Sequence, residues 1–224
     1  MVNIINLLIN IIMFSSLITI ISFCSFANNQ ELNADIINSG TISDIEIDEA
    51  SGIAASRINE DIVWVINDSG NSSLIFAVTS KGNRLATLNI QGVGNNDWED
   101  LASFKYNGKP YILIADVGDN KAKRKKCYLH FIQEPDLMKI SKSSPVSIKP
   151  SWSISFTYED GPRDCESVAV DIVNEKILLL SKRDRPPVLY EVPINKQKDI
   201  VAKRLGEIKA LSQSTQNDIR HIKY

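Results

Sequence analysis

A chain of 224 residues, with 43% hydrophobic and 23% charged side chains, has the composition of a globular protein that can bury a core. Its formal net charge of -2 lacks the basic excess that neutralises phosphates, so nucleic acid is not expected as a partner. The chain has two histidines, His130 and His221, and no Cys/His cluster, so it offers neither a zinc site nor a convincing Ser-His-Asp triad.

The N-terminal residues 1–27 form an uncharged apolar block, and the first charged side chain is Glu31. The block ends in Ser25, Phe26 and Ala27, where signal peptidase requires small residues. A cleaved secretory signal is therefore favoured, which predicts a periplasmic or extracellular protein. The block is also long enough to span a bilayer as an uncleaved anchor, so membrane attachment depends on whether it is removed.

Short segments rich in β-branched and aromatic residues follow one another beyond this block, bounded by Gly, Asn, Asp or Pro. No comparable window has a helical period, so the fold class is predicted to be all-β. Strands are expected at 41–47, 51–57, 61–68, 73–79, 85–91, 100–106, 110–116, 127–133, 151–158, 167–173, 176–182, 187–193 and 203–210. The insertions 120–126 and 134–150 are expected to be loops, where backbone stays solvated.

Two cysteines, Cys127 and Cys165, remain after removal of the signal. In an oxidising compartment they can pair, or they can stay as separate buried thiols. Two cysteines are far from a disulfide framework, so the fold must rest on its core.

An internal repeat relates DEASGIAAS from Asp48, DWEDLASF from Asp97 and DCESVAVD from Asp164. Each copy carries a glutamate, followed by an apolar residue and an alanine, and the next strand comes about ten residues later. The three glutamates are Glu49, Glu99 and Glu166. Repeats of four short strands are typical of β-propeller blades. Residues 41–224 are therefore expected to form about three four-stranded blades of a β-propeller.

Acidic residues bracket the first hairpin of each repeat. In an antiparallel hairpin the start of the first strand and the end of the second lie at the same edge. Each repeat should therefore bring its acids to one mouth of the central channel, pairing Glu49 with Asp68, Glu99 with Asp116, and Glu166 with Asp184.

Carboxylates, amide oxygens and carbonyls are the ligands that calcium and magnesium take, so one of these ions is expected, with calcium as the candidate cofactor. The predicted metal ligands are Glu49, Asp68, Glu99, Asp116, Asp119 and Glu166. Ligand contacts are expected from Asn67, Asp97, Asn120, Lys182, Arg183 and Asp184. The alternative is purely structural, with strand-end Asp, Asn and Ser side chains satisfying the loop backbone. Lys182 and Arg183 stand where the other repeats have neutral or acidic residues, which suits an anionic ligand group.

The segments EASGIA…WVINDSG…LIFAV, DWEDLA…ILIADVGDN and DCESVAVD resemble a family of secreted bacterial six-bladed β-propellers. This family is loosely akin to SdiA-regulated proteins, esterase-like phytase domains and the regucalcin/gluconolactonase group. The resemblance covers about residues 48–195, and the paired DWED and GDN motifs are its most specific part. It implies a propeller fold and, from some relatives, calcium at the channel mouth. Most close members have no established activity.

The repeat count departs from this family, because three units make half of a six-bladed ring. Residues 214–224 resemble the opening of a fourth repeat. We therefore expect an incomplete chain, either a truncated or frameshifted product or a fragment, whose exposed sheet edges favour aggregation. A dimer that closes the ring is the alternative.

The expected function is that of an exported module that binds an unidentified small-molecule or protein ligand at its acidic mouth. The alternative is a metal-assisted hydrolase of a small ester, lactone or phosphoester, with a carboxylate or a metal-bound water as the base. The sequence contains no recognisable pair of nucleophile and base, so no catalytic residue is named and binding is favoured.

Overall fold

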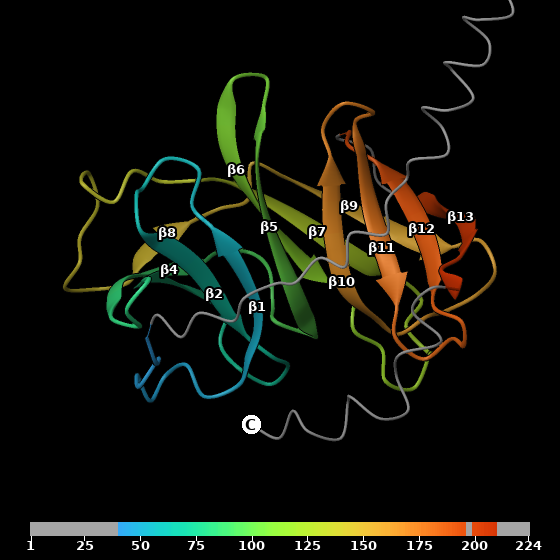
Figure 1. Cartoon of the computed structure of the whole chain (residues 1–224), viewed down its shortest axis with the longest axis horizontal. Helices are drawn as coiled ribbons and strands as arrows, with labels where there is room; N and C mark the ends of the chain where they lie inside the picture. Colours follow the sequence, from blue (N-terminus) through green and yellow to red (C-terminus); the bar gives the residue numbers. More distant parts are fainter. Residues whose placement is uncertain (1–39, 196–198, 210–224) are drawn as a thin grey trace, which may run out of the picture. The chain divides into compact units, whose positions relative to one another are not determined.

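The computed structural model describes residues 40–195 and 199–209 (Figure 1). The predicted signal segment, residues 1–27, and the residues interpreted as a fourth repeat, 214–224, lie outside the described residues. The described part is all-β, as predicted, and contains thirteen strands. Within it, no helix is long and apolar enough to cross a membrane.

Three antiparallel meanders of four strands follow one another along the chain. The first contains β1 (Ala50–Ala55), β2 (Ile62–Asn67), β3 (Leu74–Thr79) and β4 (Arg84–Ile90). The second contains β5 (Trp98–Tyr106), β6 (Lys109–Asp116), β7 (Cys127–Gln133) and β9 (Trp152–Tyr158). The third contains β10 (Cys165–Asp171), β11 (Lys176–Ser181), β12 (Val188–Pro193) and β13 (Ile200–Glu207). The strands predicted from 51–57 to 203–210 are thereby confirmed to within a few residues.

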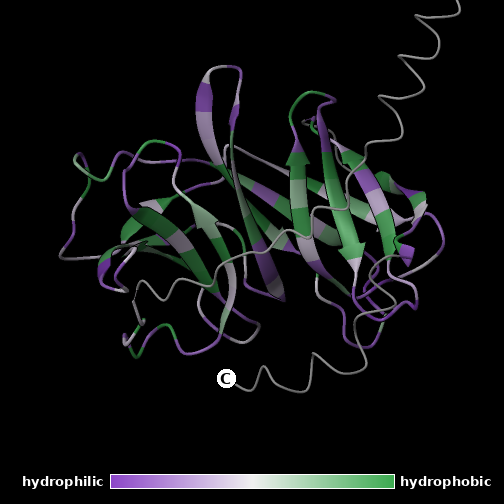
Figure 2. Ribbon diagram, viewed as in Figure 1, coloured by the Kyte–Doolittle hydropathy of each residue, from purple (hydrophilic) through white to green (hydrophobic). Residues whose placement is uncertain are grey.

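The second strands of the first two meanders contain continuous apolar runs because both of their faces are covered there. Most residues of β2 and β6 are buried. In β11 buried and half-buried residues alternate, as expected for a strand that packs on one face. Figure 2 shows hydrophobic residues along the strands and hydrophilic ones at the tip of the β5–β6 hairpin.

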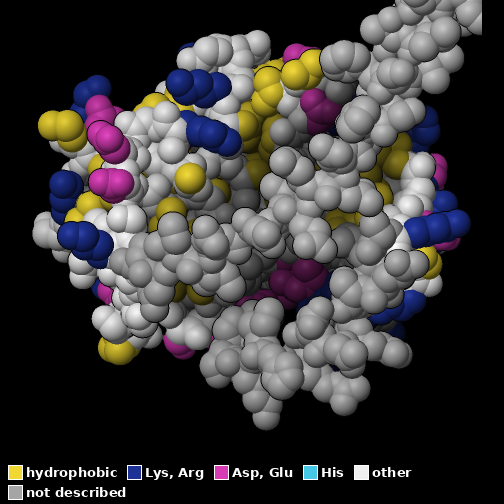
Figure 3. Space-filling view, in the orientation of Figure 1, with side chains coloured by type: hydrophobic (Ala, Val, Ile, Leu, Met, Phe, Trp, Pro, Cys, Tyr) yellow, Lys and Arg dark blue, Asp and Glu magenta, His cyan; other side chains and the backbone are white. Residues whose placement is uncertain are grey.

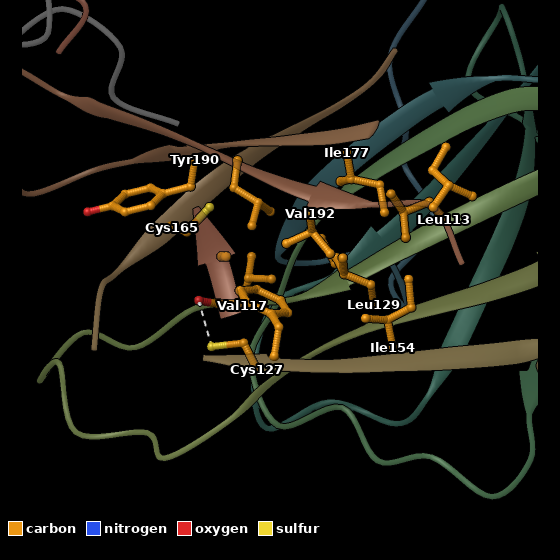
Figure 4. Close-up of a cluster of buried hydrophobic side chains, with 14 of the residues drawn as sticks. Leu113, Val117, Cys127, Leu129, Ile154, Cys165, Ile177, Tyr190 and Val192 are labelled. Carbon is orange, nitrogen blue, oxygen red and sulfur yellow. Dashed lines mark hydrogen bonds between the residues drawn. The ribbon is translucent and has the colours of Figure 1, made fainter. Parts of the chain in front are cut away.

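Two large hydrophobic clusters lie between neighbouring meanders. The cluster between the first and second meanders includes Trp64, Ile75, Leu88, Trp98 and Ile112. The cluster between the second and third includes Leu113, Leu129, Ile154, Ile177 and Val192 (Figure 4). Each meander is therefore held by side chains that it shares with its neighbour in sequence.

The two cysteines are buried as free thiols in the cluster between the second and third meanders (Figure 4). Burial raises the pKa of Cys127 and of Cys165 to about 12, which keeps both thiols protonated. Of the two alternatives left open by the sequence, the structure has the separate thiols.

The insertion 134–150, expected to be a loop throughout, contains one short strand, so this prediction was wrong in part. Val146–Ile148 forms β8, which pairs in parallel with β4 and completes a five-stranded sheet. The strand forms because β4 otherwise presents an unpaired edge, which no local pattern in the insertion reveals. In the same way β13 pairs in parallel with β9, joining the second and third meanders into one eight-stranded sheet.

The predicted strand at 41–47 is not formed, so that prediction was wrong. The segment contains a turn closed by the Ile47 amide, which donates to the Asp44 carbonyl at 3.0 Å. Ile42 and Ile47 pack on Val65, Phe76 and Val78, on the face of the first meander that is turned away from the second. The alternating pattern of the segment serves to cover this face rather than to extend a sheet.

The first strands of the three meanders, β1, β5 and β10, lie side by side (Figure 1). The Ser51 hydroxyl of β1 donates to the Trp98 carbonyl of β5 at 2.7 Å. The Val168 amide of β10 donates to the Asp100 carboxylate of β5 at 2.8 Å. The N-terminal ends of the three strands therefore meet in one place.

Replacement of Gly52 by alanine is expected to lower the free energy of unfolding by about 1–3 kcal/mol, because the side chain has no room. A Cβ atom at Gly52 would lie 2.7 Å from the Asp100 Cα atom, so β1 and β5 would have to move apart. Gly94→Ala is the matched control, since its nearest non-neighbouring atom would be 3.8 Å away. Urea denaturation measures both variants, and equal effects would contradict the close approach of β1 and β5.

Candidate functional site

The first strand of each meander is interrupted by a β-bulge at the same place. The register shifts between Ala50 and Gly52, between Trp98 and Asp100, and between Cys165 and Ser167. The extra residue is Ser51 in β1, Glu99 in β5 and Glu166 in β10. A bulge re-aims the side chain of its extra residue, so Glu99 and Glu166 are presented in the same way.

Glu49 does not hold the position that the sequence repeat assigned to it, because Ser51 stands there instead. The Glu49 carbonyl accepts from the Asp68 amide at 2.9 Å. The Asp97 and Asp164 carbonyls accept from the residues that follow β6 and β11, at 3.1 and 2.9 Å. Glu49 is therefore equivalent to Asp97 and Asp164, two residues before the bulge. The three glutamates were misaligned because the repeat was matched by residue type, whereas the bulge sets the register.

Five carboxylates converge at the N-terminal ends of β5 and β10. Oxygens of Asp68, Asp97 and Glu99 lie within 4.8 Å of one another, and so do oxygens of Glu99, Asp164 and Glu166. Figure 3 shows acidic side chains gathered in a recess of this region. We call these five residues the acidic cluster. Glu99 belongs to both groups and joins them.

Glu99 is the most constrained member of the acidic cluster. Its side chain is only 6% exposed, and its carboxylate has no hydrogen bond or ion pair within residues 40–195 and 199–209. Burial, followed by the charges of Glu166, Asp68 and Asp97, raises the pKa of Glu99 to about 8. Desolvation and nearby acids, Asp68 first, also raise the pKa of Asp97. The cluster is thus an acidic site with too little positive charge around it.

Gly118 allows the carboxylates to approach the chain this closely. A Cβ atom at Gly118 would lie 2.3 Å from Glu99 Oε1 and 2.5 Å from Asp97 Oδ2. The GDN motif therefore contributes to the site through the bare backbone of its glycine.

Two cations lie on one side of the acidic cluster. Lys182 Nζ is 2.8 Å from Glu166 Oε1, and Arg183 Nε is 2.7 Å from Asp164 Oδ2. In the part of the chain that the structure describes, no salt bridge reaches Asp68 or Asp97. The salt bridges of the acidic cluster are therefore confined to the group that contains Glu166, while Arg124, which is paired with Asp116, attracts Asp97 only from a distance.

A cavity of about 600 Å³ opens beside the cluster. Its polar lining residues are Asp48, Glu49, Ser51, Asp68, Glu99, Glu166 and Lys182. Ile42 and Ile47, from the segment that covers the first meander, form part of its apolar wall. The cluster is thus accessible from this cavity through Asp68, Glu99 and Glu166, while Asp97 lines a separate one of about 370 Å³.

Several predicted site residues lie outside the acidic cluster. Asp116 is fully buried, 2.8 Å from Arg124, and accepts hydrogen bonds from Asn96 and the Asp97 amide. Asp119 accepts from the Arg124 amide at 2.6 Å. Neither belongs to the carboxylate groups described above. Asp116 was expected beside Glu99 from the hairpin register, but register brings backbones together while side chains alternate between faces.

The remaining predicted residues hold the surrounding loops. Asn67 donates to the Glu46 carbonyl at 2.7 Å, and Asn120 accepts from Arg183. Asp184 lies 3.7 Å from Arg163, whereas Glu166, its expected neighbour, pairs with Lys182. The neighbour of Glu166 is therefore Lys182, and not Asp184 as the sequence had predicted.

Asp164 was missed as a site residue by the sequence reasoning. The signal was present, because Asp97 and Glu99 share their two-residue spacing with Asp164 and Glu166. The structure explains this spacing, since each bulge presents its glutamate close to the aspartate two residues before it.

A second cavity, of about 380 Å³, is lined by Asp116, Tyr128, His130 and Ser153, among others. The Ser153 hydroxyl is 2.8 Å from His130 Nδ1. Burial lowers the pKa of His130 to about 4, so the imidazole is a weak base at neutral pH. The oxygens of Asp116 are engaged by Arg124, Asn96 and a backbone amide. This arrangement does not favour a Ser-His-Asp triad.

No family model matches the chain, and no curated protein matches it in sequence.

Proposed function

We propose that the chain is an exported β-propeller module that binds a ligand at an acidic mouth, where the acidic cluster holds a divalent cation. Three successive four-stranded meanders support the propeller reading, because each corresponds to one blade. The side-by-side placement of β1, β5 and β10 supports it further, since the first strands of blades line the central axis. The ligand is a small molecule or a protein segment that reaches the cavity beside the cluster.

The buried and unpartnered carboxylate of Glu99 carries this proposal. A buried charge without a partner is costly, and proteins avoid it by protonation, by pairing or by coordination of a metal. Glu99 lies among four other carboxylates, of which Glu166, Asp68 and Asp97 raise its pKa, so a divalent cation is the partner that relieves the whole group.

Calcium fits the donor set best. The cluster offers hard carboxylate oxygens, with the Ser51 hydroxyl on the wall of the same cavity. Calcium accepts six to eight oxygen ligands in flexible geometry, whereas magnesium requires a near-ideal octahedron. Asp68, Asp97 and Glu99 would hold the ion, which would neutralise their charge and join the first meander to the second.

Isothermal titration calorimetry of the chelator-treated chain with calcium tests the proposal. The expected result is saturable binding, together with a thermal transition that rises by several degrees in calcium. Glu99→Gln should abolish both effects, because it removes the carboxylate shared by the two groups. Glu60→Gln, at an exposed position of the β1–β2 turn, is the matched control and should bind like the parent. Absence of calcium binding by the parent chain would overturn the proposal.

The cavity beside the cluster supports metal-assisted hydrolysis of a small ester, lactone or phosphoester as a second candidate function. About 600 Å³ is enough for a small substrate beside a bound ion, and Lys182 lines the same space. This candidate predicts calcium-dependent turnover of chromogenic ester and phosphoester substrates that is lost in Glu99→Gln. Calcium binding without turnover would contradict hydrolysis, and ligand binding would remain as the proposed function.

A further inference from the structure

We propose that Lys182 acts as a tethered cation in one half of the acidic cluster, so that the cluster takes a single divalent ion, on the side of Asp68 and Asp97. This inference rests on the proposed function and deepens it, because it sets the number of ions and their place. It follows from the unequal distribution of positive charge around Glu99.

The carboxylates alone would allow two ions. Asp68, Asp97 and Glu99 form one group of three, and Glu99, Asp164 and Glu166 form another, each with oxygens within 4.8 Å. A carboxylate shared by two such groups is the usual bridge of a two-metal site, in which the ions lie about 3.5–4 Å apart. The donor set therefore does not by itself limit the cluster to one ion.

The group formed by Glu99, Asp164 and Glu166 is already paired with two cations, Lys182 and Arg183. Lys182 Nζ lies 2.8 Å from Glu166 and is also attracted by Asp164 and Glu99. Arg183 lies 2.7 Å from Asp164, whose other oxygen accepts from the Asp119 amide at 2.9 Å. A divalent ion placed here would have to approach an ammonium and a guanidinium. Repulsion between like charges at such distances disfavours it.

The group formed by Asp68, Asp97 and Glu99 has no such ion pair. Arg124 attracts Asp97 from a distance, but its guanidinium is paired with Asp116 at 2.8 Å. Asp68 and Asp97 form no salt bridge with any described residue. Glu99 is buried with neither a hydrogen bond nor a salt bridge to the described residues, although Lys182 attracts it through space. The buried, unpartnered Glu99 carboxylate is an observation separate from the gathering of acids, and it points to a ligand that the protein itself does not supply. The free half of the cluster is therefore the half that takes the ion.

The internal repeat supports the assignment. Asp68 and Lys182 are equivalent, because each follows the second strand of its meander and donates its amide to the residue two before the bulge. The same backbone position thus presents a carboxylate in the first meander and an ammonium in the third. Lys182 is a residue that determines the stoichiometry of the site rather than a ligand.

Calcium titration of the chelator-treated full chain by calorimetry, with equilibrium dialysis as an independent count, tests the inference. The parent chain should bind one calcium ion, and Lys182→Met should bind two. The first ion should also bind about fivefold more tightly in Lys182→Met, because a neighbouring positive charge is removed. Lys149→Met, at an exposed position, is the matched control and should keep one ion at unchanged affinity.

The possible outcomes separate this inference from the proposed function. No calcium binding by the parent would refute the proposed function and the inference together. Two ions in the parent would refute the inference alone, and this count does not depend on whether a variant folds. One ion in the parent and one in a folded Lys182→Met would also refute it. If Lys182→Met fails to fold, Lys182→Gln, which keeps a polar side chain, is measured in the same way.

Discussion

Replacement of Glu134 by alanine is expected to lower the free energy of unfolding by about 3–5 kcal/mol. The Glu134 carboxylate is 3% exposed and accepts hydrogen bonds from the Trp64 indole at 2.9 Å and the Arg57 amide at 3.0 Å. It also accepts from the Ser56 hydroxyl and the Asn59 amide group. The residue follows β7 in the second meander, whereas its donors belong to the β1–β2 hairpin of the first. Its loss would leave the buried Trp64 indole and several part-buried donors unpaired at the junction of two meanders.

Urea denaturation followed by tryptophan fluorescence measures this effect. Glu134→Gln should fall between the parent and Glu134→Ala, because one amide oxygen can replace only part of the carboxylate. Glu60→Ala, at an exposed position of the same hairpin, is the control and should change stability by less than about 0.5 kcal/mol. If Glu134→Ala behaves like Glu60→Ala, the carboxylate does not connect the meanders.

Stability of the metal-free chain is expected to fall as the pH rises from about 4.5 to 8, and Glu99→Gln should remove most of that fall. The pKa of Glu99 is raised from 4.5 to about 8 in the folded chain, so the folded state holds its proton more tightly than the unfolded state. Deprotonation of Glu99 therefore lowers the free energy of unfolding. The loss begins as the pH rises above the pKa of Glu99 in the unfolded chain and is complete above its pKa in the folded chain. The rise from 4.5 to about 8 corresponds to roughly 5 kcal/mol before solvent screening, which reduces the effect because Glu99 lines an open cavity.

The measurement is the difference in unfolding free energy between parent and Glu99→Gln in chelator, at intervals from pH 4.5 to 8.5. The difference isolates Glu99 from other titrating groups, including His130, whose lowered pKa makes the chain lose stability as the pH falls below 6.5. The variant should be the more stable protein at pH 8.5 and nearly equal to the parent at pH 4.5. Parallel pH profiles would show that Glu99 is not buried among uncompensated acids.

The strands could be predicted from sequence because their signal is local. Segments such as IVWVIN in β2 and KILLLS in β11 are rich in β-branched and aliphatic residues and end at turn-forming residues. The segment 41–47 has the same local pattern and forms no strand, because its isoleucines cover the face of the first meander. β8 has hardly any pattern and forms because β4 offers a free edge. Both errors concern partners that are distant in the sequence.

The acidic site could be predicted in outline and not in detail. The repeated acids of DWED and DCES indicated an acidic edge, and Asp68, Asp97, Glu99 and Glu166 are brought together there. Asp116 could not be distinguished from Glu99, because their backbones are neighbours in the register while their side chains have different surroundings. The role of Asp164 could not be predicted either, since its position relative to Glu166 depends on the β-bulge in β10.

By itself, then, the sequence determined the all-β class, the order of the strands and the end of the meanders at which acids collect. These follow from hydrophobic patterning and from strand direction, which are properties of neighbouring residues. Only the tertiary structure decided which carboxylates face one another, that Glu99 is left without a partner, and that Lys182 lies against Glu166. The physical reason is that charge interactions act through space at distances of a few ångströms, and three β-bulges in separate strands set those distances.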